Sequence, residues 1–155
     1  MIQLINFIDL TLEEKKMILL WRNDTSIKKW MYNSDYIILD THLQYIESLK
    51  KRDDRIYFLV KNDNDYIGVI DFTSIDYKKK ETEIGLYSNP NIMGNGKILM
   101  NNIIDYGFNN LKLDRLCANL LINNIKAYNL YLKFDFKEYK KDKKLIYMEL
   151  KNENR

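Results

Sequence analysis

The fold of this chain is decided by the stretch Ser88-Asn89-Pro90-Asn91-Ile92-Met93-Gly94-Asn95-Gly96-Lys97-Ile98-Leu99-Met100. It follows a β-like run, Thr82-Glu83-Ile84-Gly85-Leu86-Tyr87, and opens the strongest helical pattern in the sequence. Residues that recur at helical spacing, and so share one helix face, are Met100, Ile103, Ile104, Gly107, Phe108 and Leu111. The stretch therefore predicts a strand over about 81–88, a glycine loop, and a helix that runs to about 111.

An anion site is expected where this helix begins. The first turn of a helix leaves backbone N–H groups without partners and carries a partial positive charge. Gly94 and Gly96 have no side chains, so a ligand could approach the bare backbone, and phosphate is the anion that fits best. Ile98 and Asn91 depart from a P-loop, and Leu99 departs from a dinucleotide fingerprint, so neither of those sites is predicted.

Length and composition indicate an ordinary globular domain. The chain has 155 residues, of which 46% are hydrophobic and 30% charged, and we expect one domain over residues 1–155. No apolar run approaches the ~20 residues of a membrane helix, the N-terminus lacks a signal pattern, and Cys117 cannot form an internal disulfide. These features predict a cytoplasmic protein with no membrane partner and no metal site.

The formal net charge of +3 is small for a chain of this size. The lysines that cluster near the C-terminus are Lys137, Lys140, Lys141, Lys143 and Lys144. We expect them on a solvated hairpin rather than on a nucleic-acid surface, so no nucleic-acid partner is predicted.

The remaining elements follow from periodicity and capping signals. Thr11 with Glu14 forms a capping box that begins a helix. Asp40 or Thr41 should cap a second helix after an aromatic-rich segment, 27–36. The expected strands are 2–7, 56–60, 66–72, 81–88, 115–120, 136–140 and 145–150, and a further helix lies near 124–134.

Two motifs lie on these elements. Asn91-Ile92-Met93-Gly94-Asn95-Gly96 is similar to Gln/Arg-x-x-Gly-x-Gly/Ala at both glycines and departs from it at Asn91. Residues 124–136 match Asn-x-x-Ala/Ser-x-x-Leu-Tyr followed by Gly-Phe, with Asp135 in place of the glycine; the matching residues are Asn124, Ala127, Leu130, Tyr131 and Phe136. With the order of elements, the motifs resemble the GCN5-related N-acetyltransferases (GNATs). The resemblance implies an α/β (α+β) fold with a mixed, mostly antiparallel seven-stranded sheet, about four helices, and splayed fourth and fifth strands.

The resemblance also implies acetyl transfer from acetyl-CoA to an amine. The pyrophosphate would lie on the loop amides, and the pantetheine would add to the edge of the splayed strand like another strand. The implied coenzyme-binding residues are Leu86, Tyr87, Asn91, Ile92, Met93, Gly94, Asn95, Gly96, Lys97 and Asn124. Tyr131 matches the general acid of the family, since a phenol with a pKa of ~10 stays protonated and can protonate the leaving thiolate.

The general base stays open between Glu83, Asp71 and His42. Glu83 is the first choice as a catalytic residue beside Tyr131, because its strand periodicity places it on one face with Gly85 and Tyr87. A lone strand cysteine such as Cys117 is usually a core residue. Direct transfer within a ternary complex is therefore expected.

The acceptor side is expected over the first helices, which cover the site in this fold. Aromatic rings there can stack on a nucleobase or sugar, and Arg and His can reach phosphates. Within the family, the chain closely resembles the bacterial sugar-nucleotide N-acetyltransferases of pseudaminic acid biosynthesis for flagellin glycosylation. These act on the 4-amino group of UDP-4-amino-4,6-dideoxy-N-acetyl-β-L-altrosamine. The implied substrate-binding residues are Arg22, Met31, Tyr32, His42, Tyr45 and Asp71.

Two alternatives stay open at this point. One is a protein N-terminal amine acetyltransferase, whose relatives carry a stretch similar to Trp21-Arg22-Asn23. The other is a non-catalytic acyl-CoA or nucleotide-binding module on the same fold, against which Tyr131 argues. The oligomeric state is also open, a homodimer included.

Overall fold

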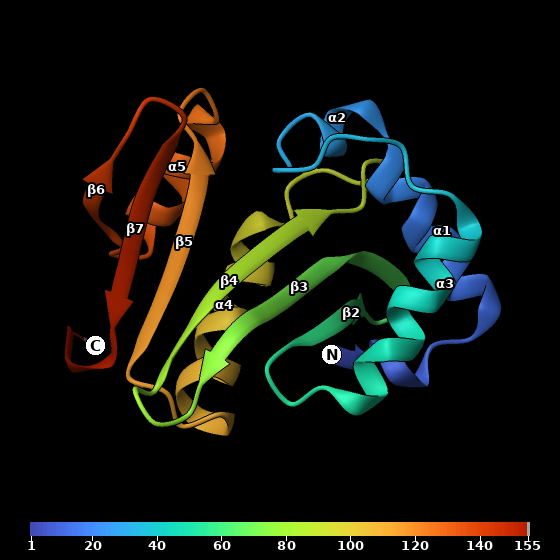
Figure 1. The fold of residues 1–155 in the computed structure, drawn as a ribbon, viewed down its shortest axis with the longest axis horizontal. Helices are drawn as coiled ribbons and strands as arrows, with labels where there is room; N and C mark the ends of the chain where they lie inside the picture. Colours follow the sequence, from blue (N-terminus) through green and yellow to red (C-terminus); the bar gives the residue numbers. More distant parts are fainter. Residues whose placement is uncertain (155) are drawn as a thin grey trace.

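The computed structural model describes residues 1–154, which build one seven-stranded sheet with helices on both faces (Figure 1). The strands lie in the order β1-β2-β3-β4-β5-β7-β6. Their bounds are β1 Ile2–Asn6, β2 Ile56–Asn62, β3 Asp65–Asp76, β4 Glu81–Ser88, β5 Arg115–Leu121, β6 Lys137–Lys141 and β7 Leu145–Lys151. The α-helices are α1 Leu12–Asn23, α2 Thr25–Lys28, α3 Leu39–Ser48, α4 Gly96–Asp105 and α5 Ile125–Lys133.

Strands β4 and β5 are the only parallel neighbours among the described strands, and they separate soon after they meet. Their ladder consists of Glu81 with Arg115, Thr82 with Leu116, and Glu83 with Cys117. Beyond Glu83 the two strands diverge toward the glycine loop, as Figure 1 shows. The predicted mixed, mostly antiparallel sheet with a splay between its fourth and fifth strands is confirmed.

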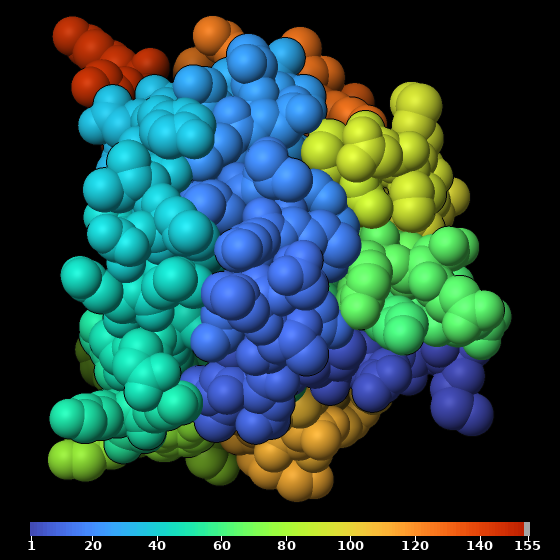
Figure 2. Space-filling view, turned by 90° about the vertical axis from the view of Figure 1, so that its right-hand side faces the viewer, coloured from blue at the N-terminus to red at the C-terminus, as the bar shows by residue number. Residues whose placement is uncertain are grey.

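The sheet divides the apolar core in two. Val69 and Ile70 are consecutive and fully buried, yet they belong to different cores, as the period of two in a strand requires. Val69 packs with α1 and α3, which lie together on one outer side of the molecule (Figure 2). Ile70 packs with α4 and with the inner face of β5 and β7. The first core therefore underlies α1 and α3, and the second includes Tyr131 of α5.

The helix starts follow their capping signals in one case and not in another. Thr11 and Glu14 form the predicted capping box at the start of α1. The prediction that Asp40 or Thr41 caps the next helix is wrong, because α3 begins at Leu39 with Ile38 at its N-cap. The Asn23 side chain accepts a hydrogen bond from the Ile37 N–H and donates one to the Ile37 carbonyl oxygen. These two bonds hold the chain extended just before α3. Asp40 then lies in the first turn, where its charge still favours the helix dipole.

The helix after the glycine loop does not continue as a regular α-helix to residue 111. Regular α4 ends at Asp105, and Tyr106–Asn110 form a π-helical turn. A Cβ on Gly107 would lie 2.8 Å from a methyl carbon of Leu116, so this turn packs directly on β5. No helix within residues 1–154 is long and apolar enough to cross a membrane.

Candidate active site

The glycine loop between β4 and α4 is anchored at its first residue. Buried Asn89 donates through its side chain to the Tyr66 carbonyl oxygen (2.8 Å) and accepts the Asn91 N–H (2.9 Å). Its own carbonyl oxygen accepts the Ile92 N–H at 3.1 Å. Asn91 and Ile92, both predicted to bind the coenzyme, therefore use their amides inside the turn.

The amides that follow have no such partners. No residue in 1–154 accepts a hydrogen bond from the backbone N–H groups of Met93 through Ile98. Gly94 has a φ of 87°, and a Cβ there would meet nothing within 4 Å. The side-chain nitrogen of Asn95 is buried without a partner. Free amides, a buried unpaired donor and an open approach at the start of α4 fit a diphosphate.

Gly96 and Asn124 also contact the protein itself. A Cβ on Gly96 would lie 3.4 Å from a methyl carbon of Leu130, an ordinary van der Waals distance, so Gly96 packs beside α5. Asn124 caps α5, since its side-chain oxygen accepts the Ala127 N–H at 3.3 Å. Both positions therefore have a packing or capping role in addition to the predicted contact with the coenzyme.

The edge of β4 that faces β5 is unpaired beyond Glu83. The parallel ladder ends at Glu83 and Cys117, while β4 continues to Ser88. Leu86 and Tyr87 lie in this free part. An extended, amide-rich ligand can hydrogen-bond to such an edge as an added strand.

Tyr131 lies on α5, buried at 5% exposure against the ring of Phe136. Asp135 ends the helix with a φ of 70°, the left-handed conformation for which glycine is usual. The Phe136 N–H bonds back to the Tyr131 carbonyl oxygen at 3.1 Å. Asp135 therefore preserves the helix end that the glycine of the motif would make.

The hydroxyl of Tyr131 lies within electrostatic range of two carboxylates of the sheet, Asp71 and Glu83. Burial, and after it the charge of Asp71, raises the pKa of Tyr131 above its usual range, and Tyr32 and Glu83 add to the rise. The phenol is therefore fully protonated at neutral pH. A protonated phenol can act as a proton donor.

Asp71 is a residue of β3, and its side chain lies next to β4 on the sheet face that α1 and α3 cover. Its partner in register is Gly85, and a Cβ on Gly85 would lie 2.7 Å from the Asp71 Oδ2 atom. Glycine at 85 is thus required for the carboxylate to lie there. Burial, and next the charge of Glu83, raises the pKa of Asp71 to about 7. This carboxyl can exchange a proton close to neutral pH.

Glu83 is the second carboxylate of the site. Its Oε1 accepts a hydrogen bond from the Asn119 side chain at 2.8 Å, a contact that spans the point where β4 and β5 separate. Burial raises the pKa of Glu83 as well. Burial also raises the pKa of the neighbouring Cys117 thiol to about 11, which keeps it protonated and a poor nucleophile.

Arg22 and Tyr32 form hydrogen bonds that position the segment between α2 and α3. Arg22 donates to the Asn33 carbonyl oxygen at 2.7 Å, and its other terminal nitrogen is buried without a partner. The Tyr32 hydroxyl donates to the Asn119 carbonyl oxygen at 3.3 Å, and burial raises its pKa to about 12. This segment therefore contacts β5 where β4 and β5 separate. Met31, the residue before Tyr32, is half-buried.

His42 and Tyr45, both predicted to bind the substrate, form hydrogen bonds to different parts of the protein. The His42 Nε2 atom lies 2.8 Å from the Lys15 carbonyl oxygen, the one hydrogen bond of this ring among residues 1–154. Burial lowers its pKa, so the ring is neutral. His42 thus ties α3 to α1, whereas Tyr45 hydrogen-bonds the Tyr57 hydroxyl (2.8 Å) on the sheet.

Comparison with known proteins identifies the family. A family model described as an acetyltransferase (GNAT) domain matches residues 5–137. The chain belongs to the GNAT acetyltransferases. This GNAT is 42% and 41% identical, over 97% of its length and 94% of theirs, to proteins named Acetyltransferase PseH from two strains of Campylobacter jejuni. It is an N-acetyltransferase.

Solved structures agree with the fold of this GNAT. The crystal structure of C. jejuni N-acetyltransferase PseH in complex with acetyl coenzyme A matches with a TM-score of 0.84 and 38% identity, over 98% of this chain and 99% of that one. Spermidine N-acetyltransferase from Vibrio cholerae, in complex with CoA and spermine, matches with a TM-score of 0.88 over 98% of this chain and 96% of that one. At 19% identity, the second likeness concerns the fold alone.

Sequence reasoning missed two polar residues of this candidate site, Arg55 and Tyr57. Tyr57 is the partner of Asp71 in register, on the same sheet face. Arg55 precedes it by two and so shares that face. The spacing of Arg55 and Tyr57, two residues apart at the start of the strand predicted over 56–60, is a sequence signal of a polar stripe. Residues 1–154 contain no group of three or more His, Cys, Asp or Glu side chains that could hold a metal ion.

Proposed function

We propose that this GNAT transfers the acetyl group of acetyl-CoA to the 4-amino group of a UDP-linked aminodideoxy sugar, UDP-4-amino-4,6-dideoxy-N-acetyl-β-L-altrosamine. The step belongs to pseudaminic acid biosynthesis for flagellin glycosylation, and we place it in the cytoplasm. The observation that carries the proposal is the Asp71 carboxyl, which has a pKa of about 7 and lies near enough to Tyr131 for its charge to raise the pKa of that phenol. The full-length identity with the C. jejuni PseH proteins supports the choice of acceptor.

The coenzyme has a place on this chain that its own atoms fit. The free amides from Met93 to Ile98 and the unpaired nitrogen of Asn95 would hold the diphosphate. The unpaired edge of β4 would hold the pantetheine arm. When bound, acetyl-CoA supplies the acetyl thioester.

The residues of the chain then move two protons. Asp71, ionised above about pH 7, accepts a proton from the attacking amine, which must be neutral to react. Tyr131 donates its proton to the departing sulfur. Glu83 is the weaker choice of base, because the Asn119 amide already occupies one of its oxygens. We therefore assign the base to Asp71, and Glu83 raises the pKa of Asp71.

Direct transfer within a ternary complex is part of the same proposal. An acetyl-cysteine route would need a thiolate at Cys117, and the pKa of that thiol is about 11. Below pH 9 only a small fraction of the thiol is ionised. Replacement of Cys117 by Ala should therefore leave a functional enzyme.

Release of free thiol from acetyl-CoA tests the proposal. The purified chain is supplied in turn with the UDP-4-amino sugar, spermidine and a panel of peptides with free N-termini. We expect the highest kcat/KM with the UDP-linked sugar. Faster turnover of spermidine or a peptide would contradict the proposed acceptor, and CoA binding without turnover of any amine would favour a non-catalytic module.

A further inference from the structure

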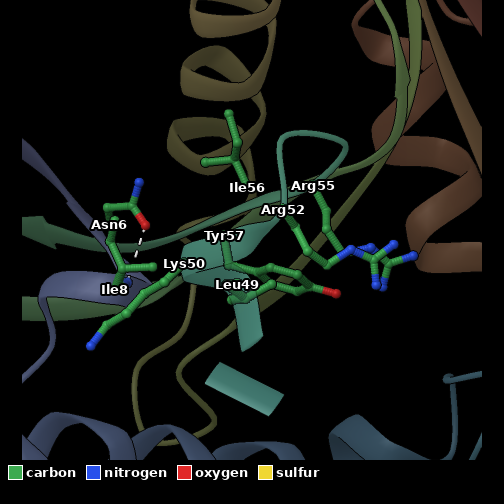
Figure 3. A pocket seen from close by; sticks show the side chains of 8 residues that line it. All are labelled: Asn6, Ile8, Leu49, Lys50, Arg52, Arg55, Ile56 and Tyr57. Carbon is green, nitrogen blue, oxygen red and sulfur yellow. Dashed lines mark hydrogen bonds between the residues drawn. The ribbon is translucent and has the colours of Figure 1, made fainter. Parts of the chain in front are cut away.

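A cavity of about 120 Å³ lies at the start of β2, beside the end of α3 and the turn that follows β1 (Figure 3). Its lining includes Asn6, Lys50, Arg52, Arg55 and Tyr57. Figure 3 shows the guanidinium groups of Arg52 and Arg55 next to one another, on the side toward which the Tyr57 hydroxyl points, while the Lys50 amine points the other way. One end of the cavity is therefore rich in positive charge and hydrogen-bond donors.

The two arginines at this end differ in what already holds them. Arg52 makes a two-pronged ion pair with Asp54, at 2.8 Å from its Nε and 2.7 Å from a terminal nitrogen. Arg55 has no carboxylate partner among residues 1–154; one terminal nitrogen donates to the Tyr45 hydroxyl at 2.8 Å. Its Nε is buried with no partner. Burial of a cationic hydrogen-bond donor costs folding free energy unless an acceptor binds it. Of the two arginines, Arg55 is therefore the one that is available to bind an anion.

Arg55 also lies on the side of the sheet that carries Asp71. Tyr57, two residues on, is the register partner of Asp71, which is the partner of Gly85. One row farther along the same face, Thr73 is the partner of Glu83. The positive charge of Arg55 opposes the rise in pKa of both Asp71 and Glu83. It therefore lies within electrostatic reach of both carboxylates.

From this arrangement we infer that Arg55, oriented by Tyr45, binds an anionic phosphate group of the acceptor and so restricts the enzyme to phosphorylated amines. The inference rests on the proposed function for the identity of the acceptor. In a sugar nucleotide the amino group and the diphosphate lie on opposite sides of one sugar ring. An amine held at Asp71 would thus direct its phosphates along the row toward Arg55. A polyamine would bring a second cation to the same position and be repelled.

Binding of UDP to enzyme saturated with CoA tests the inference without turnover. Saturation with CoA keeps UDP off the glycine loop, and calorimetry measures its Kd. Arg55→Gln should weaken UDP binding by about 10- to 100-fold, the range for a charge-assisted hydrogen bond. Arg55→Lys keeps the charge and should lose less. The matched control is Arg52→Gln, which removes the same charge from a residue already paired with Asp54 and should change Kd by less than about twofold.

Kinetics at pH 9, where Asp71 is ionised in every variant, separate recognition from a general defect. Arg55→Gln should raise KM for the UDP-linked sugar and so lower its kcat/KM by a larger factor than the kcat/KM for the free amino sugar, which has no phosphate. Equal losses with both acceptors, or an unchanged Kd for UDP, would overturn the inference. If the wild type binds UDP through Arg55 but acetylates no sugar nucleotide, the proposed function fails and the anion site stands.

Discussion

At the scale of single residues, Asp71 connects chemistry to stability. Its pKa of about 7 in the folded protein lies above the usual 3.8, because burial and Glu83 penalise its charge. The carboxyl therefore contributes most to folding below about pH 3.8, and this contribution is lost as the pH rises through about 7. Asp71→Asn should accordingly unfold at a higher urea concentration than the wild type at pH 8, with little difference at pH 4. Its kcat should fall sharply, and wild-type kcat/KM should rise through pH 7.

The Asp71 prediction separates a base from a structural carboxylate. Glu83→Gln is the comparison, since Glu83 is already bonded to Asn119. Without the charge of Glu83, the pKa of Asp71 should fall, so the pH profile of kcat/KM should move to lower pH. An Asp71→Asn protein that is less stable than the wild type at pH 8 would show that the carboxylate is stabilised by contacts rather than penalised by burial.

Tyr131 is the other residue on which the chemistry depends. No residue in 1–154 exchanges a hydrogen bond with its hydroxyl, so Tyr131→Phe leaves no buried group unpaired. We expect kcat to fall by about 100-fold or more, with KM for acetyl-CoA and the melting temperature nearly unchanged. Tyr128→Phe, one turn earlier on α5, is the control and should keep full activity. An unchanged kcat in the Tyr131 variant would remove this residue from the mechanism.

At the scale of elements, the end of α5 keeps the backbone conformation of the family motif although aspartate replaces the usual glycine at position 135. Asp135 accepts a φ of 70° where glycine would be free of strain. Asp135→Gly should therefore raise the free energy of unfolding by up to about 1 kcal/mol. Asp135→Val should lower it, because a branched Cβ is disfavoured at this φ. Urea unfolding measures both, and a less stable glycine variant would show that the aspartate side chain itself supports the turn.

At the scale of the whole molecule, local signals predicted the elements but not the contacts between them. The capping box at Thr11 and the run from β4 through Gly94 into α4 were predictable, because each depends on neighbours in sequence. The start of α3 was not, since contacts of Asn23 hold the preceding chain. Arg55 escaped notice for the same reason, because the register that sets Tyr57 opposite Asp71, and with it Arg55 on the same face, is a long-range property. The raised pKa of Asp71 likewise depends on burial.

The short seam between β4 and β5 leads to a prediction for the entire fold. One strand ladder of limited length joins β1–β4 to β5–β7, and the coenzyme would lie in the gap beyond it. CoA at a hundred times its Kd should stabilise the fold by about 2.7 kcal/mol through linkage. Hydrogen exchange should slow at 84–88, 93–98 and 117–121, and stay unchanged in β1. Gly94→Val strains a φ of 87° and fills the approach to the amides, so its own melting temperature should shift less when CoA is added. Protection that spares residues 93–98 would place the diphosphate elsewhere and remove the basis for the coenzyme site described above.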